Sequence, residues 1–231
     1  MIMEKRILIF GANGALGKGV TKILSSKNYD EIFLFDTKFD ADAKDPRIKQ
    51  IIVKDLSIEK NVIQAFSGII ENPKSNYFLF STIGGYYGGI EVRETEEVDF
   101  DRMFNMNLKS NYLILKRFSD LVKNSNGGSA CFTSAYTTIQ PEALKFAYGA
   151  SKSALNYLVK VAALESDKIN LSVNAIAPFI IDTPTNREWM KNANYESWMK
   201  PEEIGELINS LFENYNFVSG NIIELRTRFS K

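Results

Sequence analysis

The fold of this chain is decided near its N-terminus, where residues 6–36 read RILIFGANGALGKGVTKILSSKNYDEIFLFD. The apolar run 6–10 predicts a buried strand, and the helical period of residues 15–27 predicts a helix. A second apolar run, residues 31–36, predicts another strand. With the glycine-rich turn between them, these elements have the order strand, turn, helix, strand that binds the pyrophosphate of a dinucleotide.

The glycine-rich turn has the chemistry that such binding needs. Glycine permits a tight turn and a close backbone approach, and the free N–H groups at the helix start face the phosphate oxygens. A nucleotide triphosphate loop fails at two positions, because Ala12 stands where that loop needs glycine and Gly19 where it needs a hydroxyl. We expect the cofactor to contact Gly11, Asn13, Gly14, Ala15, Leu16 and Gly17.

An acidic residue, Asp36, ends the second predicted strand, about 20 to 25 residues after the turn. A carboxylate there accepts both ribose hydroxyl hydrogen bonds of NAD and repels a 2′-phosphate. The sequence therefore favours NAD(H) over NADP(H), while Lys38 nearby keeps NADP(H) open as the alternative.

Apolar runs and helical segments keep alternating along the rest of the chain. Further strands are expected over residues 48–53, 77–81, 129–133, 171–176 and 222–225, and helices over 57–71, 98–123, 146–165 and 201–213. Because each parallel connection needs a crossover of a dozen or more residues, this pattern predicts a doubly wound α/β fold of the Rossmann type. We expect one domain over residues 1–231, with a mainly parallel seven-stranded sheet and helices on both faces.

The composition excludes several classes of function. Lys plus Arg and Asp plus Glu are equal at 28 each, which gives no support to nucleic-acid binding. The chain has no histidine, so Ser-His-Asp and Cys-His catalysis and His-ligated metals are excluded, and no metal site is expected. Proton transfer must therefore use Tyr, Lys, Asp or Glu.

The cysteine content and the hydropathy pattern bear on the protein's location. A single cysteine, Cys131, forms no intramolecular disulfide and is typical of a reducing compartment, so we expect a cytoplasmic protein. The first ten residues are too weakly apolar for a signal peptide, and no segment approaches the ~18 apolar residues of a membrane span. The expected partner is a small-molecule substrate and not a membrane.

Two irregular stretches follow predicted strands. Residues 83–95 hold glycines around Tyr86 and Tyr87, and residues 178–200 hold two tryptophans. Ligands bind at the carboxyl ends of strands in an open α/β sheet. These stretches are therefore the expected walls of the site.

A tyrosine and a lysine four residues apart, Tyr148 and Lys152, share one face of an expected helix. Tyr112 and Lys116 have the same spacing, but only Tyr148 follows a serine, Ser134, at the end of the preceding strand. An ammonium about 4 Å from the phenol would lower its pKa from about 10 toward the range of proton transfer at neutral pH. Tyr148 is therefore the candidate for proton transfer.

Taken together, these motifs resemble the short-chain dehydrogenase/reductase family over essentially the whole chain. The turn fits Thr-Gly-x-x-x-Gly/Ala-x-Gly with Phe10 in place of Thr, and residues 81–84 stand where the family has Asn-Asn-Ala-Gly. Residues 178–183 match Pro-Gly-x-Ile-x-Thr, with Phe179 in place of Gly. The family's four catalytic positions are matched by Asn107, Ser134, Tyr148 and Lys152.

The resemblance implies a role for each matched residue. Tyr148 would donate the proton, and Lys152 would hold the nicotinamide ribose and lower the phenol pKa. Ser134 would hold the substrate, and Asn107 would support a water-linked proton path. Further cofactor contacts are implied for Asp55 and Leu56 near the adenine, and for Thr82, Gly84, Pro178 and Thr183.

Within this family the chain resembles the dihydropteridine reductases. Residues 84–89, GGYYGG, take the place of Gly-Gly-Trp-Ala-Gly-Gly, whose aromatic side chain faces the pterin, so Tyr86 is implied as a substrate contact. The same likeness extends over residues 10–17, 182–187 and 219–223. The resemblance also suggests that residues 183–200, with Trp189, form a lid over the substrate, and it implies a homodimer.

The sequence leaves three functions open. The first is NADH-dependent reduction of quinonoid dihydropteridine, with the proton from Tyr148. Dihydropteridine reductases typically lack the catalytic Ser and Asn that this chain has as Ser134 and Asn107, which favours the second, a general short-chain carbonyl reductase. The third is a non-catalytic dinucleotide-sensing protein, since a fold does not guarantee chemistry.

Overall fold

A central parallel sheet organises the molecule. The computed structural model describes residues 3–229, so the ends of the domain expected over residues 1–231 lie outside it. In this part of the chain the strands are β1 (Glu4–Phe10), β2 (Glu31–Asp36), β3 (Ile48–Ile52), β4 (Ser75–Ser81), β5 (Gly127–Thr133), β6 (Leu171–Pro178) and β7 (Ile222–Leu225). They form one seven-stranded sheet of order β3-β2-β1-β4-β5-β6-β7. Every neighbouring pair is parallel, so the expected doubly wound fold is confirmed and the sheet is entirely parallel.

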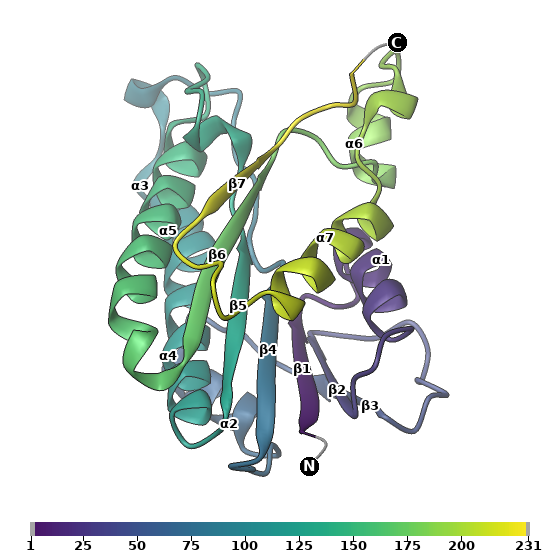
Figure 1. Ribbon diagram of the computed structural model, residues 1–231. Helices are drawn as coiled ribbons and strands as arrows, with labels where there is room; N and C mark the ends of the chain where they lie inside the picture. The colour runs from purple at the N-terminus through teal and green to yellow at the C-terminus, as the bar shows by residue number, and fades with distance from the viewer. Residues whose placement is uncertain (1–2, 230–231) are drawn as a thin grey trace.

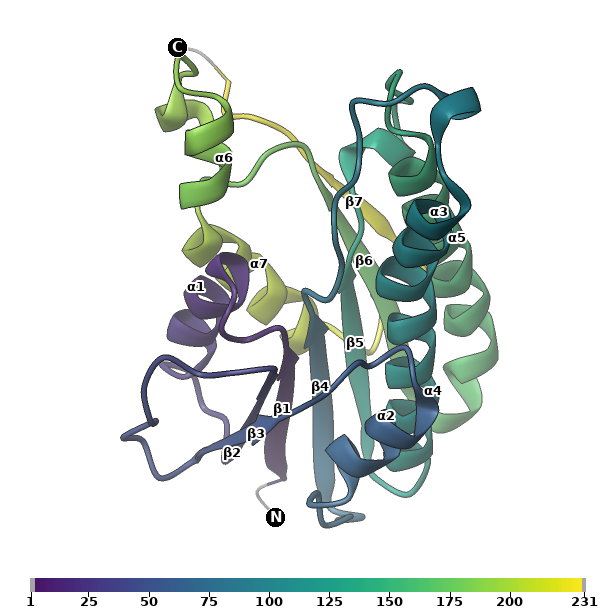
Figure 2. The same cartoon turned by 180° about the vertical axis from the view of Figure 1, so that it is seen from behind.

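Helices cover both faces of this sheet (Figures 1 and 2). One face carries α2 (Glu59–Phe66), α4 (Ser110–Lys123) and α5 (Phe146–Glu165). The other face carries α1 (Ala15–Leu24) and α7 (Pro201–Glu213). Across residues 3–229, no helix is long and apolar enough to cross a membrane.

Two shorter helices lie toward the carboxyl ends of the strands. The first, α3 (Glu97–Phe104), continues into α4 through a π-turn at Asn105–Lys109, so the long helix expected over 98–123 is present but interrupted. The second, α6 (Pro184–Trp189), lies in the segment for which the family resemblance suggests a lid. Single 3₁₀ turns occupy Val92–Glu94, Tyr136–Thr138, Ser166–Ile169 and Tyr195–Ser197.

Some predicted boundaries are wrong because side chains end the helices early. The helix expected to reach residue 27 stops at Leu24, where the hydroxyls of Ser25 and Ser26 donate to the carbonyl oxygens of Thr21 and Ile23, both at 2.7 Å. Such local hydrogen bonds compete with the next helical turn. The helix expected to reach residue 71 ends at Phe66 for the same reason, since the Ser67 hydroxyl donates to the Gln64 carbonyl oxygen at 2.8 Å.

Burial on both faces explains why the strands are continuous apolar runs. In β1, Leu8 and Phe10 pack toward α2, α4 and α5, whereas Ile7 and Ile9 pack toward α1 and α7. All of β4 is buried. Parallel strands need this composition because their crossover helices cover both faces.

The substitution of Phe10 for the family's threonine is accommodated by its neighbours. The Phe10 ring is fully buried and stacks on Phe35, with ring centroids 4.2 Å apart. The residue after β4 supplies a hydroxyl where Phe10 has none, since Thr82 Oγ1 donates to the carbonyl oxygens of both Phe10 and Gly11 at 3.1 Å. The end of β1 is therefore tied to the end of β4.

Helices α1 and α7 approach each other closely at two glycines. A Cβ atom on Gly19 would lie 2.2 Å from Cβ of Pro201, and one on Gly205 would lie 2.9 Å from Cβ of Ile23. Neither contact can be relieved by rotating a flexible side chain, because proline Cβ belongs to a ring and isoleucine Cβ adjoins the helix backbone. The two helices can pack at this distance only with glycine at these positions.

We expect Gly19→Ala to lower the free energy of unfolding by about 1–3 kcal/mol, because overpacking at Pro201 outweighs the better helix propensity of alanine. Urea denaturation measures the change. Gly68→Ala is the control, since a Cβ there meets no atom within 4 Å, and we expect a change of no more than about 0.5 kcal/mol. Equal effects of the two substitutions would contradict the packing argument.

Candidate active site

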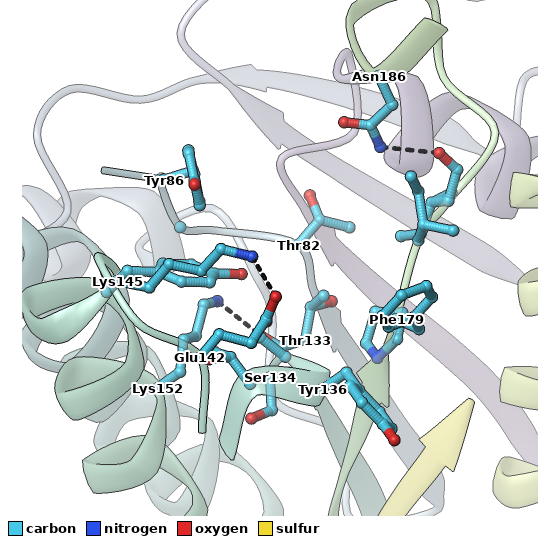
Figure 3. Close-up of a pocket in the computed structure, with 18 of the residues that line it drawn as sticks. Thr82, Tyr86, Thr133, Ser134, Tyr136, Glu142, Lys145, Lys152, Phe179 and Asn186 are labelled. Atoms are coloured by element: carbon cyan, nitrogen blue, oxygen red, sulfur yellow. Dashed lines mark hydrogen bonds and ion pairs between the residues drawn. The ribbon is translucent and has the colours of Figure 1, made fainter. Parts of the chain in front are cut away.

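A cavity of about 550 Å³ opens at the carboxyl ends of β4, β5 and β6 (Figure 3). Its walls come from the glycine loop after β4, the segment after β5, the first turns of α5, and residues 178–190. Both expected wall stretches therefore contribute to it. Polar groups from the ends of these strands gather in the cavity.

Lys152 lies at the bottom of this cavity and is 4% exposed. Its ammonium donates a 2.6 Å hydrogen bond to the carbonyl oxygen of Thr133, the last residue of β5. Burial lowers the pKa of Lys152 to about 8. An ammonium has three N–H donors, so donors remain for a ligand in the cavity.

Tyr148 lies one helical turn before Lys152 and is half-buried. The Tyr86 ring packs edge-on against it, with centroids 5.1 Å apart. Burial, and then the neighbouring Tyr86 and Glu142, raise the pKa of Tyr148 above its ordinary value. The expectation that Lys152 lowers this pKa is wrong in this structure, because the phenol is withdrawn from water and the ammonium donates to Thr133.

Ser134 follows β5 and is 2% exposed. Its backbone N–H donates to the carbonyl oxygen of Ile176 at 2.7 Å, which fixes its place beside β6. Its side-chain hydroxyl has no hydrogen-bond partner among residues 3–229. Since Ser134 also lines the cavity, its buried hydroxyl lies beside the space that a ligand would occupy.

Asn107 is fully buried in the π-turn between α3 and α4, a kind of helix defect that occurs often at functional sites. Its Oδ1 accepts from the N–H of Gly85 at 2.8 Å, and its Nδ2 donates to the Gly85 carbonyl at 3.1 Å and to Ser151 Oγ at 3.0 Å. The Ser151 hydroxyl in turn donates to the carbonyl oxygen of Tyr148 at 2.9 Å. Asn107 thus ties the glycine loop to the helix that carries Tyr148.

Asn111, one turn further along, was not identified from the sequence. Its Oδ1 accepts from Ser81 Oγ at 2.6 Å, and its Nδ2 donates to the carbonyl oxygens of Ile83 at 3.1 Å and Asn107 at 2.9 Å. These bonds brace the end of β4, where the family has an asparagine and this chain has Ser81. The signal in the sequence was that Asn111 lies four residues after Asn107, a spacing that places both side chains on one face of a helix.

The glycine turn at the start of α1 has the shape that a dinucleotide requires. Gly11 has a φ of +76°, and a Cβ on Gly17 would lie 2.1 Å from the Gly11 carbonyl oxygen. Gly14 is the N-cap residue, followed by Ala15 and Leu16. No side chain within the described residues caps this helix, so its first N–H groups can bind phosphate oxygens.

Asp36 lies beside that turn. Its Oδ2 accepts a 2.8 Å hydrogen bond from the N–H of Asn13, and its Oδ1 accepts from the N–H of Thr37 at 2.7 Å. A second carboxylate, Asp40, accepts from the Asn13 side chain at 3.3 Å and pairs with Lys18. The residues present therefore fit the pyrophosphate and ribose of a dinucleotide.

The remaining expected cofactor contacts divide into two groups. Thr82, Gly84 and Pro178 line the cavity. Asp55 is exposed beyond β3, Leu56 is buried in the core, and Thr183 instead caps α6, its Oγ1 accepting from Asn186 at 3.2 Å.

Gly84 cannot carry a side chain in this arrangement. A Cβ there would lie 2.6 Å from Asn107 Oδ1 and 2.8 Å from Lys152 Nζ. The backbone of the glycine loop therefore passes directly over two of the four family positions.

The expected substrate contacts Tyr86 and Trp189 meet at the mouth of the cavity. Their ring centroids are 5.8 Å apart, and the two side chains remain partly exposed. Together with Tyr148, they give one wall of the cavity an aromatic surface.

Three further wall residues, Tyr136, Glu142 and Lys145, lie outside the stretches that the sequence analysis expected. Tyr136 packs edge-to-face on Phe179 with centroids 5.1 Å apart, and Glu142 and Lys145 form an ion pair at 2.6 Å. All three lie between β5 and α5, a segment that also follows a strand and could have been found by the same rule.

The Ser134 hydroxyl, unpaired within residues 3–229, leads to a prediction about stability. We expect Ser134→Ala to leave the free energy of unfolding unchanged or to raise it by up to about 1 kcal/mol, because a buried unpaired hydroxyl is removed. Ser129→Ala is the matched control, since it removes the 2.7 Å partner of the buried Ser172 hydroxyl and should cost about 1–3 kcal/mol. Both values come from urea denaturation, and a loss at Ser134 as large as at Ser129 would show that its hydroxyl is already paired.

Comparison with known proteins agrees with this geometry. A family model described as short chain dehydrogenase matches residues 5–194. The dihydropteridine reductase of Dictyostelium discoideum is 28% identical over 233 residues, covering 98% of this chain and 96% of that protein.

Two solved structures share the fold at lower identity. ElxO with NADP bound has a TM-score of 0.80 and 21% identity, covering 97% of this chain and 98% of its own. The 3-ketoacyl-(acyl-carrier-protein) reductase of Brucella melitensis, complexed with NADH, has a TM-score of 0.81 and 18% identity, covering 96% of both chains. Because the family model spans most of the residues that build the sheet and the cavity, the chain belongs to the short chain dehydrogenase family and is an oxidoreductase of the short-chain dehydrogenase/reductase type.

Proposed function

We propose that this chain is an NADH-dependent reductase of quinonoid dihydropteridine. The observation that carries the proposal is a single cavity that combines polar groups for proton transfer with an aromatic wall. The polar groups are Tyr148, Lys152 and the unpaired hydroxyl of Ser134, and the aromatic wall is Tyr86, Tyr148 and Trp189. A flat bicyclic ring is complementary to such a wall.

The proposed reaction moves one hydride and one proton to the substrate, and bound NADH would supply the hydride. Tyr148 would donate the proton, since its raised pKa keeps the phenol protonated at neutral pH. Lys152, with a pKa of about 8, would be mainly charged at pH 7 and would bind the ribose hydroxyls with the N–H donors that Thr133 leaves free. Ser134 would hydrogen-bond the substrate and hold it against Tyr148.

Asn107 would act through its neighbours. Its bonds to Gly85 and Ser151 hold the glycine loop and α5 at a fixed spacing, so the Tyr86 ring stays against Tyr148. A water-linked proton path through this turn remains our expectation from the family.

The similarity to the Dictyostelium enzyme over 98% of the chain supports the pterin substrate. Tyr86 supports it independently, because the loop 84–89 places this ring against both Tyr148 and Trp189. A substrate ring in contact with Tyr148 would also contact Tyr86.

Replacing Tyr148 tests the proposed proton donor. We expect Tyr148→Phe to lower kcat with quinonoid dihydropteridine by about 10²–10⁴-fold while the Kd for NADH changes little, because only the hydroxyl is removed. The oxidation of NADH, followed by absorbance, gives the rate, and NADH fluorescence gives the Kd. Tyr112→Phe is the control, since Tyr112 has the same spacing to a lysine but lies on α4, away from the cavity. Wild-type turnover by Tyr148→Phe would remove Tyr148 from the mechanism.

The family binds NAD(P)H, and we propose NADH as the preferred form for this chain. Asp36 supports this choice, because its carboxylate lies at the turn where it would accept from ribose hydroxyls and repel a 2′-phosphate. Asp40 adds a second negative charge next to the same turn. Lys38 is exposed, and Lys18 is already paired with Asp40.

We expect Asp36→Ala to reduce the ratio of kcat/KM for NADH to that for NADPH by about 10- to 100-fold, the effect of losing one charged hydrogen-bond partner. Steady-state kinetics with both cofactors measures the ratio. Asp42→Ala, an exposed acidic residue in the loop after β2, should leave it unchanged. An unaltered ratio in Asp36→Ala would remove the assignment.

A general carbonyl reductase is the second candidate. The unpaired hydroxyl of Ser134 favours it, because this group could polarise a ketone or aldehyde carbonyl beside Tyr148. Reduction of ketones or aldehydes by the purified protein, with no turnover of quinonoid dihydropteridine, would select this function over the first.

We further propose that residues 183–200 form the substrate lid of a single reductase domain. Trp198 is 3% exposed, and Ile181 pairs with Met199, which anchors both ends of the segment to the molecule. Trp189 in α6 is instead 65% exposed at the cavity mouth. An anchored segment with an exposed aromatic side chain at the cavity mouth suits closure over a bound ring.

A homodimer in a reducing, cytoplasmic compartment completes the proposal. Tyr157 and Leu164 on α5 are 72% and 83% exposed, and their helix forms the outer layer of one face (Figure 1). Apolar side chains in such positions are typical of an interface between subunits.

Cys131 is a buried, free thiol, which supports a reducing compartment.

A further inference from the structure

An ion pair in the cavity wall takes no direct part in the proton transfer proposed above. The ammonium of Lys145 lies 2.6 Å from the Glu142 carboxylate, and both side chains remain partly exposed to the cavity. Figure 3 shows the pair on the side of the cavity that also carries Tyr86 and Lys152. Its charges therefore face any ligand that reaches Tyr86.

The backbone between these two residues adopts an unfavourable conformation. Leu144 has a φ of +65°, a region that branched side chains rarely adopt. The segment is held there by the glycine loop, since Gly89 donates a 2.8 Å hydrogen bond to the Leu144 carbonyl and Ile90 pairs with Lys145. Strain of this kind is typical of sites that clamp ligands, and here it fixes Glu142 and Lys145 relative to Tyr86.

The Glu142 carboxylate also affects the pKa of the proposed proton donor, Tyr148. After burial and Tyr86, Glu142 is the next cause that raises the pKa of Tyr148. The carboxylate therefore lies near enough to the phenol to disfavour its ionised form. A substrate ring that contacts Tyr148 and Tyr86 would present its outer edge to this pair.

We infer that Glu142 and Lys145 bind the 2-amino-4-oxopyrimidine edge of a pterin. That edge carries an amino N–H, a ring N–H and a carbonyl oxygen in a row. A carboxylate accepts from the two adjacent N–H groups, and an ammonium donates to the carbonyl oxygen. The inference rests on the proposed function, and it adds the residues that would select a pterin from other flat rings.

The test measures binding of an oxidised pterin, 6-hydroxymethylpterin, by its own fluorescence, with the full chain saturated with NAD⁺ so that no hydride is transferred. The comparison ligand is the matching lumazine, in which oxygen replaces the 2-amino group. We expect wild type to bind the pterin at least about tenfold more tightly than the lumazine, because only the pterin offers two N–H groups to Glu142.

Two variants separate the two charges. Glu142→Gln should weaken pterin binding by about 10- to 100-fold and abolish the preference over lumazine. Lys145→Met should weaken both ligands about equally, because both retain the 4-oxo group. Asp120→Asn is the matched control, since it removes another ion pair of i,i+3 spacing, with Arg117 on α4, and should change neither affinity.

The outcomes separate this subsite from the proposed function. If Glu142→Gln retains wild-type affinity and preference, or if wild type binds the two ligands equally or not at all, the subsite is wrong, even when quinonoid dihydropteridine is turned over. If the preference is present in wild type and lost in Glu142→Gln, the subsite stands, even when wild type shows no turnover and the proposed function fails.

Discussion

The two-sided burial of the parallel strands is the constraint on which the rest of the molecule depends. Side chains along β1, β4, β5 and β6 have helices against both faces, so most of them are apolar, and a polar one within a strand, such as Ser129, is hydrogen-bonded to a neighbour. Polar groups that line the cavity lie where the strands end. Because all strands are parallel, these ends lie along one edge, and Thr82, Ser134 and Pro178 come together there although they are far apart in the sequence.

The residues of the site formed at this edge lower the stability of the folded chain. Burial that lowers the Lys152 pKa from 10.5 to about 8 corresponds to about 3 kcal/mol against its charged form. Leu144 adds an unfavourable backbone conformation, and Ser134 a buried hydroxyl with no partner in the described part of the chain. Close helix packing elsewhere, such as that of Gly19 against Pro201, stabilises the folded chain and offsets these costs. Functional sites typically contain such locally unfavourable groups within a domain that is otherwise well packed.

Much of this could be predicted from the sequence, and the misses have physical causes. The order of strands and helices along the chain agrees with expectation, Asp36 lies beside the glycine turn, and Tyr148 and Lys152 line one cavity. The predicted lowering of the Tyr148 pKa was wrong. Spacing along a helix does not show how far the phenol is removed from water, nor that the Lys152 ammonium donates to the carbonyl oxygen of Thr133. Glu142 and Asn111 were missed for a related reason: their importance comes from partners on other elements.

The sequence by itself determined what depends on near neighbours. Alternating apolar and helical runs decided the elements, glycine spacing decided the turn, and four-residue spacing placed Tyr148 and Lys152 on one helix face, because these properties follow from local backbone geometry. Only the tertiary structure decided which groups meet across the strand ends and how far each is removed from water. Burial and Coulomb interaction depend on distance through space, so the charge on Lys152, the free hydroxyl of Ser134 and the position of Glu142 were settled by packing alone.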